Sequence, residues 1–224
     1  MRSEYCRRVH IIDELRHHLP YSVTSVAVSI CVLGVLWGLM GEMRFSYAAR
    51  GLFHVFHPLH LLFSATTTAA MFWRYDKNLV KALIVGLLGS LVVCAASDIA
   101  IPYLAGVLLG VGMDLHICII EHWQMEVPFA VFGIFLGIAM PSTIKTTSLS
   151  HSAHVFTSSM ASILYLVSFG LTDWLSAIGM VFIYTLIAVV LPCCTSDIVF
   201  PLFLTSQPAH VHDGQGSEHL GHNH

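Results

Sequence analysis

Residues 79–101, LVKALIVGLLGSLVVCAASDIAI, form an apolar run in which the only charged side chains are Lys81 and Asp98. A helix of about 20 predominantly apolar residues is long enough to cross a bilayer. Five further runs of this kind lie at residues 21–41, 52–73, 127–144, 152–171 and 174–203. The sequence therefore predicts an all-α polytopic membrane protein with six transmembrane helices.

The composition of the whole chain agrees with this prediction. Of the 224 residues, 56% are hydrophobic and 10% are charged, and the mean hydropathy is +0.76. An average soluble domain has about a quarter of charged residues, so an ordinary cytosolic enzyme and a disordered protein are both excluded. The balance of 10 Lys+Arg against 13 Asp+Glu excludes a nucleic-acid-binding protein as well. The partner that this composition requires is a lipid bilayer.

The basic residues predict the orientation of the chain in the membrane. Cytoplasmic loops carry an excess of Lys and Arg. With the N-terminus inside, two basic residues, Arg44 and Arg50, face outward, and eight face the cytoplasm: Arg2, Arg7, Arg8, Arg16, Arg74, Lys77, Lys81 and Lys145. The charged first segment has no short apolar core followed by a cleavage site, so it is interpreted as a retained tail and not as a signal peptide. We expect a cell-membrane protein with both termini in the cytoplasm.

Two motifs occur twice, in the same order. HPLHLLFS at residues 57–64 is matched by HSAHVFTS at residues 151–158, and both read HxxHxxxS. CAASDIAIP at residues 94–102 is matched by CCTSDIVFP at residues 193–201, and both contain CxxSDIxxP. Upstream of them lie two GxxxG pairs, which are typical of close helix packing. The first glycine of each pair, Gly34 or Gly133, lies 64 residues before the Asp of its motif, so the order indicates an internal duplication.

Each copy holds three of the expected spans, and an odd number of spans inverts the second copy in the membrane. We therefore expect a 3+3 inverted-topology repeat, an arrangement found in many secondary transporters. The boundaries are 1–20 for the cytoplasmic N-terminal tail, 21–108 for the first repeat, 109–126 for the outer connection, 127–204 for the second repeat and 205–224 for a His-rich cytoplasmic tail. A proline follows the Asp by four residues in both the third and the sixth helix, which indicates that these helices are broken or re-entrant.

The duplicated motifs supply candidate metal ligands. Residues at i, i+3 and i+7 share one helix face, so each half presents two imidazoles next to a carboxylate. The candidate ligands are His57, His60 and Asp98 on the outer side of the membrane, and His151, His154 and Asp197 on the inner side. These groups suit Zn²⁺ first, and also Fe²⁺, Mn²⁺, Co²⁺ or Ni²⁺. Cys94 and Cys193 are either further ligands that favour Zn²⁺ or small packing residues. A bound cation compensates the cost of an Asp at membrane depth, about 2.5 to 3.5 kcal/mol.

The function that these features favour is a transporter or channel for a divalent transition-metal ion. Ions enter near one cluster and leave near the other, and the short chain is compatible with a homodimer. Three alternatives stay open: a membrane metalloenzyme with one dinuclear centre acting on a lipid or on O₂, a proton-coupled carrier of an organic solute, and a haem protein with axial His. Close approach of His60 and His154 would favour the enzyme. No catalytic residue is assigned.

The outer connection is rich in possible ligands but is not duplicated. It contains His116, Cys118, Glu121 and His122, which form either an external capture site for metal or a solvated loop. His54, one turn before His57, has no counterpart in the second half, and we expect it to assist ion entry.

Overall fold

The computed structural model describes residues 2–140 and 144–194. Its elements are α1 (Arg2–Met40), α2 (Glu42–Tyr75), α3 (Leu79–Cys94), the π-helical segment η1 (Ala95–Ala100), α4 (Ile101–Leu108), α5 (Cys118–Glu121), α6 (Trp123–Ala139), α7 (Ile144–Ser168) and α8 (Ile178–Cys194). Every regular element in these two ranges is helical, so the prediction of an all-α protein is confirmed.

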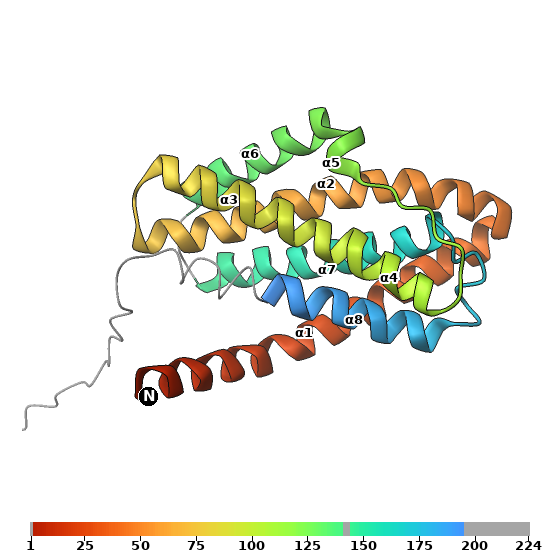
Figure 1. The fold of residues 1–224 in the computed structure, drawn as a ribbon, viewed down its shortest axis with the longest axis horizontal. Coiled ribbons are helices and arrows are strands. Elements are labelled where there is room, and N and C mark those ends of the chain that lie inside the picture. Colours follow the sequence, from red (N-terminus) through yellow and green to blue (C-terminus); the bar gives the residue numbers. More distant parts are fainter. Residues whose placement is uncertain (1, 141–143, 195–224) are drawn as a thin grey trace, which may run out of the picture.

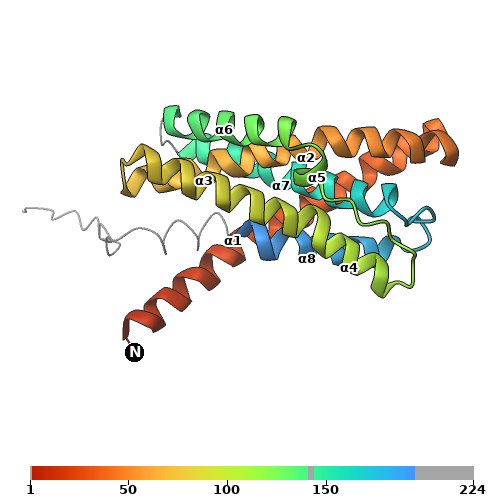
Figure 2. The same cartoon turned by 45° about the horizontal axis from the view of Figure 1, so that its top comes forward.

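The long helices alternate in direction along one elongated bundle (Figure 1). α1 begins and α8 ends toward the end of the bundle that also holds the turn between α2 and α3, whereas the turn between α1 and α2 lies at the opposite end. The first half of α1 extends away from the other helices (Figure 2). α2 and α7 lie at the centre, because α2 contacts α3, α6 and α7, and α7 contacts α1, α8 and η1.

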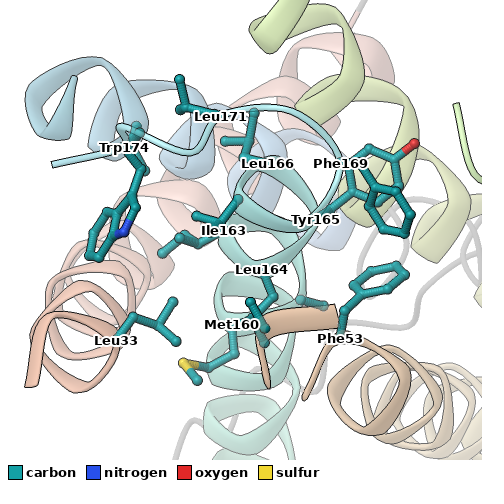
Figure 3. Packing of buried hydrophobic residues seen from close by; sticks show 14 of the residues in the cluster. Leu33, Phe53, Met160, Ile163, Leu164, Tyr165, Leu166, Phe169, Leu171 and Trp174 are labelled. Carbon is teal, nitrogen blue, oxygen red and sulfur yellow. The ribbon is translucent and has the colours of Figure 1, made fainter. Parts of the chain in front are cut away.

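The largest apolar core lies around the second half of α7. Figure 3 shows Met160 between Leu33 of α1 and Phe53 of α2, with Tyr165 and Phe169 next to Phe53. Trp174, in the turn after α7, is fully buried in the same cluster. This core fixes α7 against both α1 and α2.

Two helical stretches are long and apolar enough to cross a membrane: Leu19–Met40 within α1, and Leu79–Leu108, which joins α3, η1 and α4. Only 17% of the first window and 33% of the second are buried in the molecule, whereas a core helix of a soluble protein is mostly buried. On α3, Val80, Ile84, Leu88 and Val92 follow one another at four-residue intervals and are all exposed. An outward apolar stripe of this kind is typical of a lipid-facing helix.

The helix that carries Asp98 is not interrupted, in contrast to the break expected between Asp98 and Pro102. Its hydrogen bonding changes from α to π over Ala95–Ala100 and returns to α in α4, where Pro102 occupies the first turn. Because η1 runs directly into α4, the backbone N–H of Ile101 still bonds to the carbonyl of Ala96, whereas Pro102 has no N–H and leaves the helix one hydrogen bond short. The irregular feature at Asp98 is therefore a π segment, a distortion that is frequent at functional sites. The corresponding stretch around Asp197 lies outside the described residues.

α6 packs closely on α2 through the second GxxxG pair. A Cβ atom added at Gly133 would overlap the carbonyl oxygen of Leu62, and one added at Gly137 would overlap the carbonyl oxygen of Thr66. The close packing predicted for this pair is thus confirmed. The first pair differs, because a Cβ at Gly34 or Gly38 would meet no described atom within 4 Å.

Gly133→Ala is expected to destabilise the protein, because the added methyl group would push α6 away from the backbone of α2. Overpacking of this kind costs about 1 to 3 kcal/mol, which should lower the melting temperature of the detergent-solubilised protein by several degrees. Gly34→Ala is the matched control and should leave the melting temperature unchanged or raise it, since Ala is the better helix former. Equal melting temperatures for the two variants would contradict the observed packing of α6 on α2.

Candidate metal centre

A buried polar cluster lies in the middle of the bundle, where α2 meets η1. Nδ1 of His57 and Nδ1 of His60 lie 2.8 Å and 2.7 Å from the same oxygen, Oδ2 of Asp98. The exposed fraction is 2% for His57 and zero for His60 and Asp98. The i, i+3 spacing therefore does bring both imidazoles of the first motif to the carboxylate of the second motif.

The other oxygen of Asp98 is also engaged. Oγ of Ser97 donates to Oδ1 of Asp98 at 2.7 Å. The carbonyl of Ser97 in turn accepts a hydrogen bond of 3.0 Å from Oγ of Ser162 on α7. These contacts hold the carboxylate between α2 and α7 and define which way its two oxygens face.

The shared carboxylate determines which nitrogen of each imidazole carries a proton. An ionised carboxylate only accepts hydrogen bonds, so both Nδ1 atoms donate to Asp98. In the neutral form of each ring the lone pair is then on Nε2, which points away from Asp98. A ligating His almost always donates its other ring N–H to a carboxylate or carbonyl, which orients the ring and raises its basicity. Asp98 occupies this orienting position for both His57 and His60.

Nε2 of His57 faces a second carboxylate and a thiol. It lies 3.2 Å from Oε1 of Glu126, which is itself 3% exposed. One ligand atom each from His57, Glu126 and Cys118 lie within 4.8 Å of one another, and all three residues are buried. Burial raises the pKa of the Cys118 thiol, and the neighbouring Glu126 carboxylate acts in the same direction. Cys118 is therefore protonated unless a cation coordinates its sulfur, which removes the proton.

Nε2 of His60 faces a different set of groups. It lies 3.8 Å from Sγ of Cys94. The His60 ring also stacks on the ring of His154 from α7, with centroids 4.9 Å apart and an interplanar angle of 27°. His154 is fully buried, so the second HxxH motif contributes to the same buried region as the first.

The structure thus brings four of the six predicted ligands together, namely His57, His60, Asp98 and His154. The side chain of His151 and all of Asp197 lie outside the part of the chain that the structure describes, as does the side chain of Cys193. The expectation that the two motifs lie on opposite sides of the membrane is wrong for His60 and His154, whose rings are in contact.

Two residues of the cluster were not among the predicted ligands. Glu126 lies in the first turn of α6, just before its apolar run. An ionisable residue at the edge of a span is the feature of the sequence that could have indicated a functional role. Cys118 was named only as part of the outer connection. Neither residue belongs to a duplicated motif, so the repeat gave no indication of them.

Comparison of the chain with models of protein families, with curated proteins and with solved structures gives no match.

Proposed function

We propose that the protein is a membrane transporter or channel for a divalent transition-metal ion, with Zn²⁺ as the first candidate. The observation that carries this proposal is the fully buried cluster of His57, Asp98 and Glu126 inside a helical bundle with an apolar exterior. Zn²⁺ prefers nitrogen, carboxylate oxygen and thiolate ligands, and all three types face one another here. Fe²⁺, Mn²⁺, Co²⁺ and Ni²⁺ are the other candidates.

Charge balance supports a divalent ion. Asp98 and Glu126 place two carboxylates in the buried interior of the bundle, where an uncompensated charge costs several kcal/mol. His57 has a carboxylate at each of its two ring nitrogens, so without a bound cation its imidazole holds a proton on both. A divalent cation that binds Nε2 replaces one of these protons and balances the two carboxylates. Within the described residues no Lys or Arg side chain forms an ion pair with either carboxylate.

The pattern of helix contacts supports the inverted repeat. If α1, α2 and α3 correspond to α6, α7 and α8, contacts in one half should have counterparts in the other; three do, whereas the contact of α1 with α2 has no comparable counterpart between the described residues of α6 and α7. The contact of α2 with α6 corresponds to that of α7 with α1, the contact of α3 with α6 to that of α8 with α1, and the contact of α2 with α3 to that of α7 with α8. Transporters with inverted repeats bind their ions near the bilayer midplane at the repeat interface, and the contact of His60 on α2 with His154 on α7 supports a site of this kind here.

The membrane placement follows from the same arrangement. We take α1, α2, the α3–α4 segment, α6, α7 and α8 as the six spans. The turn between α2 and α3 carries Arg74, Lys77 and Lys81 at the end of the bundle where α1 begins. The positive-inside rule then puts that end, and both termini, in the cytoplasm.

The test is zinc uptake into liposomes that contain the purified full-length protein and an entrapped zinc-sensitive dye. We expect wild-type protein to admit Zn²⁺ and His57→Gln to reduce the initial rate to that of protein-free liposomes, a fall of at least about 100-fold if one central ligand is lost. Asp173→Asn, at an exposed turn residue, is the control and should keep the wild-type rate. Metal bound at the buried cluster without any uptake by the wild-type protein would overturn transport.

A second candidate function is a membrane metalloenzyme with a dinuclear centre. The contact between the rings of His60 and His154 favours it, because two motifs that meet can share a pair of ions. Two tightly held metal ions per chain, retained during dialysis and accompanied by no uptake, would support this candidate over a transporter.

A further inference from the structure

Three histidines outside the buried cluster come together where α2 meets the segment before α6. Ring centroids of His54 and His116 are 5.2 Å apart, those of His54 and His122 are 4.8 Å apart, and those of His116 and His122 are 5.7 Å apart. One ring nitrogen of each lies within 4.8 Å of the others. Nitrogens on a tetrahedral Zn²⁺ with bonds of about 2.0 to 2.1 Å are about 3.3 Å apart, so small side-chain rotations bring all three to one ion.

The segment that carries two of these histidines is fixed in place. After α4 the chain runs back along the bundle to α5 (Figure 1). The backbone N–H of Asp114 donates to the carbonyl of Phe169 at 2.8 Å, and the backbone N–H of His116 donates to Oη of Tyr165 at 3.1 Å. Tyr165 lies in the last turn of α7 and Phe169 directly follows this helix, and both belong to the large apolar core, which therefore holds His116 at its position.

Aromatic rings form one wall of this cluster. The ring of His116 stacks on Phe169 with centroids 4.8 Å apart and an interplanar angle of 12°. Figure 3 shows Phe53 beside Tyr165 and Phe169. The centroid of the Phe53 ring lies 5.4 Å from that of His54 and 5.3 Å from that of His57. The rings therefore restrict how far His54 and His116 can turn.

His116 is oriented as a metal ligand usually is. Oε1 of Glu121 lies 3.0 Å from Nδ1 of His116, which places the ring proton on Nδ1 and the lone pair on Nε2. Nε2 of His116 is buried and has no hydrogen-bond partner among the described residues. A carboxylate on one nitrogen and an available lone pair on the other is the pattern of a ligating His.

We propose that His54, His116 and His122 form a second metal-binding site, which takes the same class of divalent transition-metal ion directly from water. His54 and His116 are half-buried and His122 is exposed, in contrast to the buried cluster. Packing of the three rings edge-on or tilted against one another, with no ligand, does not explain why one imidazole, that of His116, has both a carboxylate at Nδ1 and a buried Nε2 without a described partner.

The second site has the properties of an entrance, a role that rests on the proposed transport function. His54 lies one helical turn from His57 of the buried cluster, and Phe53 contacts both rings. Among the described residues one carboxylate, that of Glu121, forms an ion pair with these histidines, and the guanidinium of Arg50 lies 4.9 Å from the centroid of the neighbouring Phe169 ring. Weaker charge compensation should make binding weaker here than at the buried cluster. Conduction requires such a site, strong enough to be filled and weak enough to release its ion.

The test is Co²⁺ binding to the full-length chain in detergent, with the five histidines of residues 210–224 replaced by Ala so that they do not bind metal. We expect His122→Ala to remove one of the bound ions per chain while leaving the cobalt–thiolate absorption of the buried cluster unchanged. Glu121→Gln should lower the Co²⁺ affinity of the same site by about 10- to 100-fold. The control is Glu42→Gln, which removes an exposed carboxylate on a different helix, α2, and should leave the affinity unchanged. Because His122 is exposed, its replacement should not impair folding.

The outcomes separate this proposal from the proposed function. Unchanged stoichiometry and affinity in both His122→Ala and Glu121→Gln would overturn the second site, whatever the uptake assay shows. If His122→Ala binds one Co²⁺ ion fewer than the wild type and the wild type shows no uptake, the second metal-binding site is supported and the transport function is overturned.

In liposomes, His122→Ala should slow zinc uptake at low zinc concentration and have the wild-type rate at saturating zinc, as expected for an entry site.

Discussion

Asp98→Ala should lower the affinity of the buried cluster for Zn²⁺ or Co²⁺ by more than about 100-fold. Loss of one carboxylate that orients a single ligating His costs 10- to 100-fold in affinity, and Asp98 orients both His57 and His60. The substitution also leaves two buried N–H groups without their acceptor, at about 1 to 3 kcal/mol each. Competition with a chelating dye, in protein lacking the tail histidines, measures the affinity.

Two variants make this result specific to Asp98. Ser97→Ala removes the hydrogen bond to Oδ1 of Asp98 and a longer one, 3.4 Å, to the carbonyl of Cys94, and it keeps the acceptor of both imidazoles, so its effect should be well below that of Asp98→Ala. Asp173→Ala removes an exposed carboxylate and should leave the affinity unchanged. Equal affinities for wild type and Asp98→Ala would mean that the carboxylate only neutralises the histidines and takes no part in metal binding.

The grouping of His57, His60 and Asp98 could be predicted from the sequence, because helix periodicity and the internal duplication both point to these residues. The spacing of His57 and His60 puts them on one face of any helix, and the matched SD motif identified Asp98 as the partner. This prediction did not depend on where the helices begin or end. The structure confirms it, because Asp98 contacts the rings of both His57 and His60.

The depth of the two motifs was predicted wrongly, because hydropathy locates apolar segments and does not locate helix ends. The apolar run at 52–73 places His57 near the start of a span. In the structure α2 begins at Glu42 and α7 begins at Ile144, so His57 and His154 both lie well inside their helices. Polar residues such as those between Glu42 and Arg50 lower the hydropathy without ending the helix. The two motifs can then meet at one level of the bundle.

Tertiary packing determined the rest of the cluster. The segment between α4 and α6 follows the end of α7 because Asp114 and His116 hydrogen-bond to Phe169 and Tyr165. This path buries Cys118 beside His57. A loop pinned by contacts from a distant helix has no periodicity, so a single sequence could place its residues only as candidates.

Cys118→Ser should abolish the cobalt–thiolate charge-transfer absorption of the Co²⁺-loaded protein, whereas Cys94→Ser should retain it. The reason is geometric: Cys118 shares its surroundings with Nε2 of His57 and with Glu126, while Cys94 lies 3.8 Å from Nε2 of His60. Both substitutions replace a buried thiol by a hydroxyl of similar size, so each is the control for the packing effect of the other. Glu126→Gln keeps the shape of its side chain and removes one of the two buried charges, so Co²⁺ should bind more weakly and keep the thiolate absorption. If Cys94→Ser lost the absorption and Cys118→Ser did not, the ion would lie between His60 and His154, and the shared dinuclear centre would become the better account of the cluster.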